Sequence, residues 1–281
     1  MAHPQIAAFA RLAEENARPT RLIAGQATLL SRTMHDIRYD ELHDEVFVTN
    51  PFARAILTYR GGADGNEAPI RIIQGSKTEL GDPTRYAGGP DRLDVDPIHN
   101  EIFVPDGSRV LVYPRLGNGN IAPIRILQGP DTRLDDMGTA AVDPVNNVLV
   151  VAQDIVTKAS GNRAYILIFD RTAQGNTKPR GVIHGPKTEI TRINQLQIYS
   201  PKGWIVAAQP GFIDEQIPEN VYVGIWSIHD NGDVPPRWKL GGSNSVMLKP
   251  RGVAINAKHK ELIVADMRLN AALTYYFPEI F

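Results

Sequence analysis

Polar side chains that could do chemistry recur at two positions of a repeated sequence pattern. The first position lies two residues before an apolar run, one copy of which begins at Leu93, and in the five copies it holds His35, Asp91, Gly138, Gln195 and Arg251. The second position follows the next apolar run, where the chain has Asn50, Asp106, Gln153, Gln209 and Asp266. Imidazole, carboxylate and guanidinium groups could transfer protons or hold a hard cation, and amides could bind a polar ligand.

Two functional interpretations of these residues stay open. In a hydrolase or lyase, the catalytic residues would be His35, Asp91, Asp106 and Arg251. In a binding protein, both sets would line a polar funnel that contacts the ligand. A structural interpretation competes with both, because Asn and Asp at strand ends commonly cap the following turn. Of the seven histidines only His35 is near the expected funnel, and zinc usually needs three facing ligands, so we predict no metal and no cofactor.

The elements that must position these residues are short strands in a repeat. A phrase of the form Pro-x-Arg-x-x-x-Gly occurs at 19–25, 69–75, 123–129 and 235–241, with a weaker copy at 179–185. After each copy come a polar loop, a hairpin such as 92–106 and a third apolar run such as 109–115. One four-stranded sheet cannot bury both of its faces alone, whereas several sheets arranged radially can. We therefore predict an all-β fold, a β-propeller of four-stranded blades.

The units containing "VDP", "NEIFVPD" and "SRVLVYPR" resemble propeller repeats of the NHL type or the closely related YVTN type. The resemblance covers essentially residues 19–281, and it implies the fold without implying a particular activity. The chain departs from the repeat pattern in its long loops at 153–164 and 209–221. It also departs in the fourth unit, where Ser200 and Pro201 stand in place of Asp-Pro.

The same resemblance indicates what an enzyme of this kind would need. Related propellers that act as lactonases or lyases rely on a metal held by Glu, Asn and Asp, or on several histidines. No glutamate stands at the start of an inner strand in this chain. Glu215 and Glu219 lie instead on the long loop at 209–221, which could fold over the funnel.

Five hairpins predict five blades, with residues 19–281 as a single propeller domain and residues 1–18 as an N-terminal segment. The last unit ends after its third strand, and the strand at 19–25 would complete it. Residues 5–19 align with the third strand and loop at 55–69, but their Ala-rich composition favours a short N-terminal helix over a strand. A six-bladed protein is an alternative. So is a homo-oligomer whose copies exchange terminal strands.

The arginine of the repeated phrase could suggest an anion-binding track. Its copies are Arg21, Arg71, Arg125 and Arg237. We predict instead that this arginine lies on the outer strand of each blade. There its stem would cover apolar surface and its charge would blunt an exposed strand edge.

Composition excludes several function classes. Lys and Arg number 30 against 31 Asp and Glu, a formal net charge of −1, so we expect no nucleic-acid partner. The absence of cysteine excludes disulfides and thiolate sites. No apolar run is long enough to span a membrane. The first 20 residues lack the pattern of an export signal, and a secreted or periplasmic location is favoured only with the signal peptide absent from this sequence.

We predict a non-catalytic binding scaffold that holds a protein, peptide or glycan with its loop face and central funnel. The prediction rests on the repeat, the long loops and the lack of a catalytic triad or metal constellation in the sequence. One alternative is a lactonase-like hydrolase or lyase with its site at the channel mouth. The other is an assembly module that exchanges terminal strands between subunits.

Overall fold

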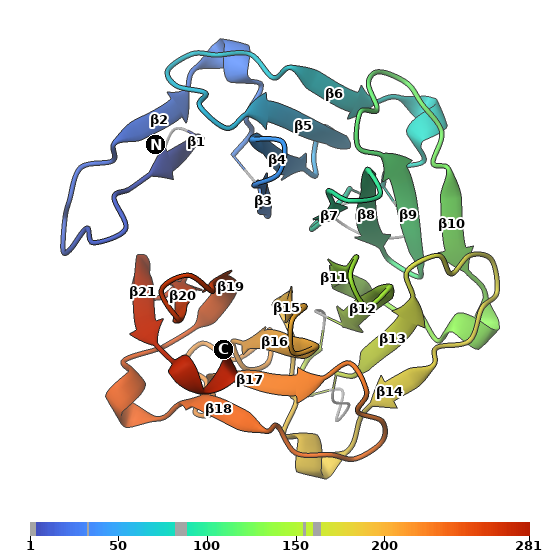
Figure 1. The fold of residues 1–281 in the computed structure, drawn as a ribbon, viewed down its shortest axis with the longest axis vertical. Coiled ribbons are helices and arrows are strands. Elements are labelled where there is room, and N and C mark those ends of the chain that lie inside the picture. Colours follow the sequence, from blue (N-terminus) through green and yellow to red (C-terminus); the bar gives the residue numbers. More distant parts are fainter. Residues whose placement is uncertain (1–3, 33, 82–88, 154–155, 160–163) are drawn as a thin grey trace. The chain divides into compact units, whose positions relative to one another are not determined.

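The protein is built almost entirely of short antiparallel strands, which a computed structural model describes over residues 4–32, 34–81, 89–153, 156–159 and 164–281. The helices among these residues are single 3-10 turns of three residues each. Five sheets are of the blade type, and a sixth sheet has two strands (Figure 1). The predicted fold class is confirmed: an all-β propeller with five blades. Over the described ranges, no helix has the length and apolarity needed to cross a membrane.

The strands of each blade are numbered in chain order. The two-stranded sheet contains β1 (Gln5–Ala8) and β2 (Arg21–Ala24). Blade 1 contains β3 (Ile37–Asp40), β4 (Glu45–Asn50), β5 (Ala55–Arg60) and β6 (Arg71–Gln74). Blade 2 contains β7 (Asp94–Asp96), β8 (Glu101–Asp106), β9 (Arg109–Pro114) and β10 (Arg125–Gln128). Blade 3 contains β11 (Met137–Asp143), β12 (Val148–Gln153), β13 (Ile166–Asp170) and β14 (Gly181–Ile183). Blade 4 contains β15 (Gln195–Tyr199), β16 (Trp204–Gln209), β17 (Tyr222–Ser227) and β18 (Trp238–Gly241). Blade 5 contains β19 (Pro250–Asn256), β20 (Glu261–Asp266) and β21 (Ala271–Tyr276).

The chain divides into two compact units. The first contains residues 1–102 and 111–124, and the second contains residues 103–110 and 125–281. The β1–β2 pair and blade 1 lie in the first unit, and blades 3, 4 and 5 lie in the second. Blade 2 contributes residues to both units.

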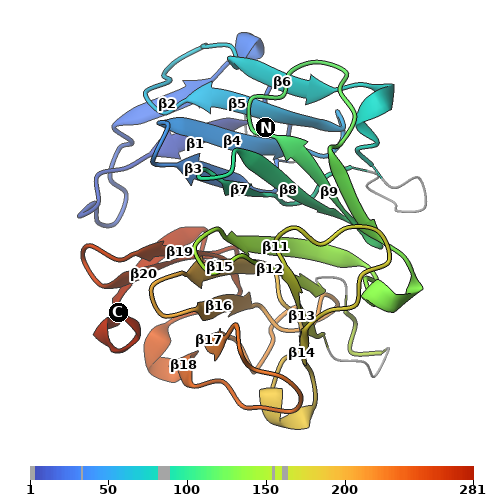
Figure 2. The same cartoon turned by 45° about the vertical axis from the view of Figure 1, so that its right-hand side comes forward.

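The core of the second unit lies between the faces of neighbouring sheets. Blades 3 and 4 lie side by side (Figures 1 and 2), and their facing side chains form one buried apolar cluster that includes Val150, Ile168, Ile205 and Trp226. These four side chains are fully buried. Each face therefore removes the apolar surface of the next sheet from water, which is the main stabilising contribution in such a fold.

The N-terminal strand pair repeats the outer half of a blade. Gln5 lies opposite Ala24 in the β1–β2 ladder, and in blade 1 the equivalent pair of the β5–β6 ladder is Ala55 opposite Gln74. The favoured N-terminal helix is therefore wrong, and the alternative of a strand is confirmed. Ladder hydrogen bonds, with the packing of Ile6 against the apolar cluster of blade 1, outweigh the helical preference of alanine.

Blade 5 has three strands in the part of the chain that the structure describes. The sequence predicted that the strand at 19–25 would complete this blade. In the structure β2, which lies in that segment, pairs with β1 instead. The physical reason is that β1 offers β2 the same ladder that a third strand offers the outer strand in the other blades.

A repeated backbone contact, which we call the outer stitch, joins an outer strand to the following blade. Its parallel bridges are Ile23 to Gly65, Ile73 to Gly119, Leu127 to Gly175 and Ile183 to Gly232. The four glycines have φ between 56° and 81°, which other residues adopt only with strain. At the first stitch the Ala24 N–H donates to the Gly65 carbonyl at 2.9 Å, and the Gly65 N–H donates to the Leu22 carbonyl at 2.8 Å. β2 thus binds blade 1 as the outer strand of a preceding blade would.

A Gly-x-x-Thr turn shapes the loop from each outer strand to the next inner strand. The buried Thr78 hydroxyl donates to the Gly75 carbonyl at 2.7 Å and accepts from the Leu80 N–H at 3.3 Å. The Thr78 carbonyl accepts from the Tyr113 hydroxyl of blade 2. The same turn recurs at Thr28, Thr132, Thr188 and Ser245.

The repeated arginines lie at the outer strands, as predicted. Three of them begin outer strands and one directly precedes its strand: Arg21, Arg71, Arg125 and Arg237. The Arg71 guanidinium donates to the Glu45 carboxylate at 2.6 Å. The guanidinium of Arg125 lies over the ring of Phe103, and that of Arg237 lies over the ring of Trp204. These contacts give the arginines a structural role on the blade surface.

Thr78→Val keeps the shape of the side chain but removes a hydroxyl that makes two hydrogen bonds. We expect the free energy of unfolding to fall by about 1–3 kcal/mol, because the Gly75 carbonyl and the Leu80 N–H lose their partner. Urea unfolding followed by tryptophan fluorescence measures this change. Thr177→Val is the matched control, since the exposed Thr177 hydroxyl donates to the Gln174 carbonyl. Equal losses in the two variants would contradict the role given to the turn.

Candidate ligand-binding site

Both sets of predicted site residues lie at the same end of their own blade. The first set stands at the start of the inner strand and the second at the end of the next strand, and antiparallel pairing brings these points together. Met137 pairs with Gln153 in blade 3, and Pro250 pairs with Asp266 in blade 5. We call this the loop end of a blade. It carries the loop that enters the blade and the connection from the second strand to the third.

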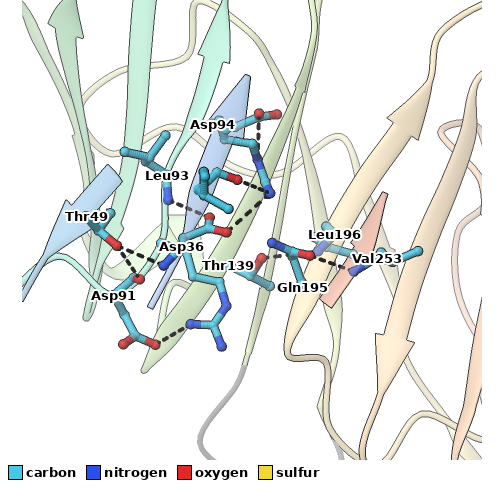
Figure 3. Close-up of polar contacts among 12 residues, drawn as sticks. Asp36, Thr49, Asp91, Leu93, Asp94, Thr139, Gln195, Leu196 and Val253 are labelled. Atoms are coloured by element: carbon cyan, nitrogen blue, oxygen red, sulfur yellow. Dashed lines mark hydrogen bonds and ion pairs between the residues drawn. The ribbon is translucent and has the colours of Figure 1, made fainter. Parts of the chain in front are cut away.

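In the first unit the structure brings His35 and Asp91 together, from blades 1 and 2. Nδ1 of His35 contacts Oδ1 of Asp91, whose Oδ2 accepts from the Arg92 guanidinium at 2.7 Å. The Asp91 carbonyl accepts from the Thr49 hydroxyl at 3.0 Å (Figure 3). The carboxylate therefore orients the imidazole, as a catalytic pair requires.

Asp106 and Gln153 lie in the second unit, at the ends of β8 and β12. The Asp106 carboxylate is fully buried and accepts from the Arg109 guanidinium at 3.2 Å. Gln153 is half-buried, and its backbone carbonyl accepts from the Ile193 N–H at 3.3 Å. In the part of the chain that the structure describes, no group of three or more His, Cys, Asp and Glu side chains could hold a metal ion.

A polar side chain that we call the inner latch joins the inner strands of consecutive blades (Figure 3). The latches are Asp36 to the Leu93 N–H at 3.2 Å, Thr139 to the Leu196 N–H at 3.3 Å, and Gln195 to the Val253 N–H at 2.6 Å. In each case a side-chain oxygen accepts the bond. The latch ties a backbone donor of one inner strand to the preceding blade, and it therefore sets how the two strands are aligned.

Gln195 stands at the latch position, and its placement in the predicted set needs a correction. The sequence pattern predicts the same position for Gln195 as for His35 and Asp91, but its contact is the one that Asp36 makes in blade 1. The residue of blade 4 that matches Asp91 is Asn194, one position earlier. The spacing agrees with this, because Gln195 and Thr139 each stand ten residues after the glycine of their own copy, which is Gly185 for Gln195 and Gly129 for Thr139.

Asp266 organises the loop end of blade 5. Its buried carboxylate accepts hydrogen bonds at 2.8–3.0 Å from four backbone N–H groups, those of Leu248, Lys249, Arg268 and Leu269. These bonds join the loop that enters the blade to the turn that follows β20. Asp266 therefore has a structural role, because it fixes the backbone of the two segments that carry Lys249 and Arg268.

Asn50 and Gln209 hold the entering loop of their own blades in the same way. The Asn50 amide donates to the Leu29 carbonyl at 3.1 Å and accepts from the Ser31 hydroxyl at 2.7 Å. Oε1 of Gln209 accepts from the Thr191 N–H at 3.0 Å. A glutamine side chain is long enough for this role, because the partner lies in the entering loop rather than in the following turn.

Arg251 lies in an irregular step of the β19–β20 ladder, between Pro250 and Gly252. Gly138 occupies the same place in blade 3. An extra residue in a ladder changes the direction of its side chain and is common beside functional sites. Arg251 therefore combines a charged side chain with irregular strand pairing at the loop end of blade 5.

Arg251 belongs to a basic cluster that sequence reasoning missed, formed with Arg192, Lys249 and Arg268. Arg192 is 1% exposed and Lys249 is 8% exposed, whereas Arg251 is half-buried and Arg268 is exposed. Burial lowers the pKa of Lys249, and the charges of the three arginines lower it further, while Glu215 opposes them. The charges of the three arginines therefore act on the Lys249 ammonium group at the loop ends of blades 4 and 5.

A comparison of the copies could have found this cluster. Arg192 and Lys249 each stand seven residues after the glycine that precedes the 3-10 turn, which is Gly185 in one copy and Gly242 in the other. In blade 3 the same position holds an acidic residue, Asp136. A basic residue at the same position of two consecutive copies is the signal in the sequence that points to this cluster.

The long loop at 209–221 folds back onto both of its neighbours. The Ile213 N–H donates to the Val156 carbonyl at 3.1 Å, and the Asp214 carboxylate accepts from the Lys158 N–H at 2.9 Å. This backbone donor is the main reason why the pKa of Asp214 is lowered. On the other side, Nζ of Lys249 donates to the Glu215 carbonyl at 2.7 Å. The loop therefore connects the loop ends of blades 3, 4 and 5 beside the basic cluster.

Gln195→Leu removes the acceptor for the Val253 N–H. We expect the free energy of unfolding to fall by about 1–3 kcal/mol and the Val253 amide to exchange faster with solvent, because a partly buried donor loses its partner. Gln195→Glu keeps an acceptor and should restore slow exchange. Gln197→Leu, on the same strand, is the matched control. Hydrogen exchange by NMR measures the effect, and an unchanged Val253 amide in the leucine variant would contradict the latch.

Comparisons with known proteins show the fold and no closer relationship. No protein-family model matches this chain, and no curated protein matches it. Among solved structures 741 chains match. One of them belongs to the "Crystal structure of Nidogen/Laminin Complex", with a TM-score of 0.59 and 14% sequence identity, over 98% of this chain and 91% of that chain. At this identity the likeness shows the propeller fold alone.

Proposed function

We propose that this chain is a non-catalytic binding propeller, with repeats of the NHL or YVTN type, that holds a partner protein at the loop ends of blades 4 and 5. The observation that carries the proposal is a set of exposed apolar side chains, which we call the apolar rim: Ile213, Ile217, Val246, Leu248, Met267 and Leu269. Single exposed apolar residues are ordinary, but several of them around a basic cluster are typical of a protein contact. The matched structure is a complex of two proteins, which supports a binding role.

Hydrogen bonds hold the loops of the apolar rim together. Asp266 links the loop containing Leu248 to the turn containing Met267, and the Met267 N–H donates to the Lys249 carbonyl at 3.1 Å. Nζ of Lys249 reaches the Glu215 carbonyl on the third loop. Because these loops are ordered before a partner arrives, binding loses less conformational entropy.

Val246 is strained as well as exposed. Its φ of 55° and ψ of 0° lie in the left-handed region, where a β-branched residue is an outlier. The equivalent residues of other copies also have positive φ, and three of them are polar: Glu79, Arg133 and Glu189. A strained backbone that displays an apolar side chain costs free energy in the isolated protein. A partner that buries this side chain would offset that cost.

The aliphatic character of the rim favours a protein or peptide over a glycan, because sugar hydroxyls need polar partners when they are buried. The hydrolase or lyase alternative would rest on the His35–Asp91 pair, which lies in the first unit. The apolar rim and the basic cluster lie together in the second unit. A binding role for the apolar rim and the basic cluster therefore does not depend on the His35–Asp91 pair.

Val246→Asn tests the proposed binding surface, because asparagine adopts the left-handed region easily and removes the apolar contact. We expect the variant to be more stable than the wild type by about 1 kcal/mol. We also expect it to bind about tenfold less tightly to peptides selected on the wild-type protein from a phage-displayed library. Fluorescence titration of the selected peptides gives the Kd.

Val145→Asn is the control, because Val145 is 68% exposed on the inner hairpin turn of blade 3, away from the loop end. The proposal fails if no library peptide binds the wild-type protein saturably. It also fails if Val246→Asn binds the selected peptides as well as the wild type does, or if Val145→Asn loses as much affinity. A glycan array probed in parallel identifies a sugar ligand, which would overturn the choice of a protein partner.

A second candidate function, assembly through terminal strands, is favoured by two open strand edges. Among the described strands, β21 pairs with β20 alone and β1 pairs with β2 alone. The side chains of β21 are largely exposed, whereas those of the corresponding strand β5 are mostly buried. An edge of this kind accepts a further strand readily. Pairing of β21 in one copy with β1 in another would give a head-to-tail oligomer.

Ala272→Lys places a charge on β21 without disturbing a buried position. We expect the wild-type mass in sedimentation to rise with concentration and the variant to remain a monomer, because an edge lysine opposes strand addition. Ala257→Lys makes the same change in the exposed hairpin turn of blade 5 and should behave as the wild type does. A wild-type mass that stays monomeric at every concentration would rule out assembly by this route.

A further inference from the structure

The outer edge of blade 5 differs from that of the four preceding blades. Among the described strands β21 pairs with β20 alone, whereas β5, β9, β13 and β17 each pair with an outer strand as well (Figure 1). The Phe277 N–H donates to the Lys260 carbonyl at 2.9 Å, so its backbone faces β20. Because backbone groups alternate between the two sides of a strand, those of Ala272 and Thr274 point to the open edge. This edge therefore presents ladder donors and acceptors to a further strand.

The sequence and pairing of β21 are those of a strand that carries an outer strand. β21 reads Ala-Ala-Leu-Thr-Tyr-Tyr, and β5 reads Ala-Ile-Leu-Thr-Tyr-Arg. Thr274 lies opposite Ile263 in blade 5, as Thr58 lies opposite Phe47 in blade 1. In both strands the hydroxyl of the first tyrosine donates to a carbonyl of the Gly-x-x-Thr turn or its serine equivalent. The β5–β6 ladder is therefore a guide to what β21 would accept.

The β5–β6 ladder shows which side chains an outer strand brings. Thr58 lies opposite Arg71, and Leu57 lies opposite Ile72. Leu57 and Ile72 both pack in the apolar cluster of blade 1. In blade 5 the residue equivalent to Leu57 is Leu273, which packs against the apolar cluster of blades 4 and 5. An added strand with an aliphatic residue at this point would extend that cluster.

Glu261 stands where the arginine of an outer strand makes its contact. The Arg71 guanidinium donates at 2.6 Å to Glu45, which is the first residue of β4. In blade 4 the guanidinium of Arg237 lies over the ring of Trp204, the first residue of β16. The first residue of β20 is Glu261, which is half-buried. An arginine in an added strand would therefore reach a carboxylate, as it does in blade 1.

The existing contact of Glu261 is compatible with this role. Its carboxylate accepts from the Asn256 amide at 2.9 Å. A carboxylate has about four acceptor positions, so one hydrogen bond does not exclude another. Glu45 illustrates this, because it accepts from the guanidinium of Arg115 as well as from that of Arg71.

We propose that the open edge of β21 binds an extended segment of a different protein as the fourth strand of blade 5. The segment has an arginine followed by two aliphatic residues, and its arginine pairs with Glu261. Backbone hydrogen bonds supply the affinity in this mode of recognition, and the side chains supply the specificity. The inference rests on the same open edge as the assembly route above, but it assigns a different strand to that edge.

The source of the strand follows from the contacts of β2. β2 has the outer-strand pattern, so a second copy could in principle supply it. However, β1 pairs with β2 along one edge, and the outer stitch to Gly65 lies on the other. β1 itself corresponds to a third strand, which is not the type that pairs with a third strand in the other blades. A separate protein is therefore the source that requires no existing ladder to break.

The test uses a peptide with blocked ends, Ala-Pro-Ile-Arg-Ile-Ile-Gln-Gly, which is residues 68–75 of this chain. It is titrated into the full chain, and its Kd is measured by calorimetry. Hydrogen exchange of the protein amides is followed by NMR. We expect saturable binding and slowing of the Thr274 amide by about tenfold, because an added strand takes up this donor.

Two N-methylated forms of the peptide test the ladder. The Ile72 N–H donates to the Asn118 side chain at 2.9 Å, so it points away from β5. The next donor, the Ile73 N–H, therefore points to β5. A methyl group on the nitrogen equivalent to that of Ile73 should abolish binding. The same group on the nitrogen equivalent to that of Ile72 is the matched control and should leave most of the affinity.

A third comparison tests the pairing with Glu261. A peptide with glutamine in place of arginine should bind about fivefold more weakly to the wild-type protein, since it loses a partly exposed ion pair. Glu261→Gln should remove this preference for arginine. Glu219→Gln is the matched control, because Glu219 is exposed on the loop at 209–221. It should retain the full preference.

The outcomes separate this inference from the functions proposed above. Absence of saturable binding overturns it, as does equal binding of the two N-methylated peptides. Equal binding of the arginine and glutamine peptides overturns the role of Glu261. If the wild-type protein sediments as an oligomer that the peptide dissociates, a second copy fills the edge and the choice of a different protein is wrong.

Val246→Asn should bind the strand peptide as the wild type does, because Val246 lies at the loop end. Equal weakening by Val246→Asn and by N-methylation would place the peptide on the apolar rim and overturn the edge. Failure of the strand peptide leaves the partner site at the loop ends to be decided by the peptides selected from the library.

Discussion

Every blade of this protein faces one constraint: a four-stranded sheet has two apolar faces, and neighbouring sheets must bury them. The buried cluster between blades 3 and 4 meets this need with apolar side chains. Burial alone does not fix how two sheets are aligned. The outer stitch does so with hydrogen bonds between backbone groups, and the inner latch does so with a side-chain oxygen that accepts from a backbone N–H. These contacts explain why Gly119, Gly175 and Gln195 stand where they do.

The same constraint decides which polar residues are available for function. Asn50, Gln209 and Asp266 are used to hold the loops that enter their blades, and Gln195 is used as a latch. A partner would therefore contact the side chains of the loops that these hydrogen bonds hold in place. At the loop ends of blades 4 and 5 that surface combines the basic cluster with the apolar rim, and the strained Val246 lies within it.

Much of the fold could be predicted because the repeat recurs at the scale of a blade. The repeated phrase, the Asp-Pro turns and the alternating runs locate the strands with little help from tertiary contacts. The N-terminal segment was the exception, since its local helical preference lost to a ladder with β2. The candidate site was predicted less well. Equivalent residues of the repeats located the loop ends. The role of Lys249 and Arg192 could not be predicted, because it depends on their burial and on the effect of the Arg192 charge on the Lys249 pKa.

The sequence by itself determined the blade as a unit, the arginines on the outer strands and the end of each blade where variation gathers. These properties depend on strand periodicity and turn chemistry, which act over a few residues. Only the tertiary structure decided that Asp266 is structural, that Gln195 is a latch, and that the charges of three arginines act on Lys249. Hydrogen bonds and charge interactions depend on distances between residues that are remote in the chain, and those distances exist only after the sheets have packed.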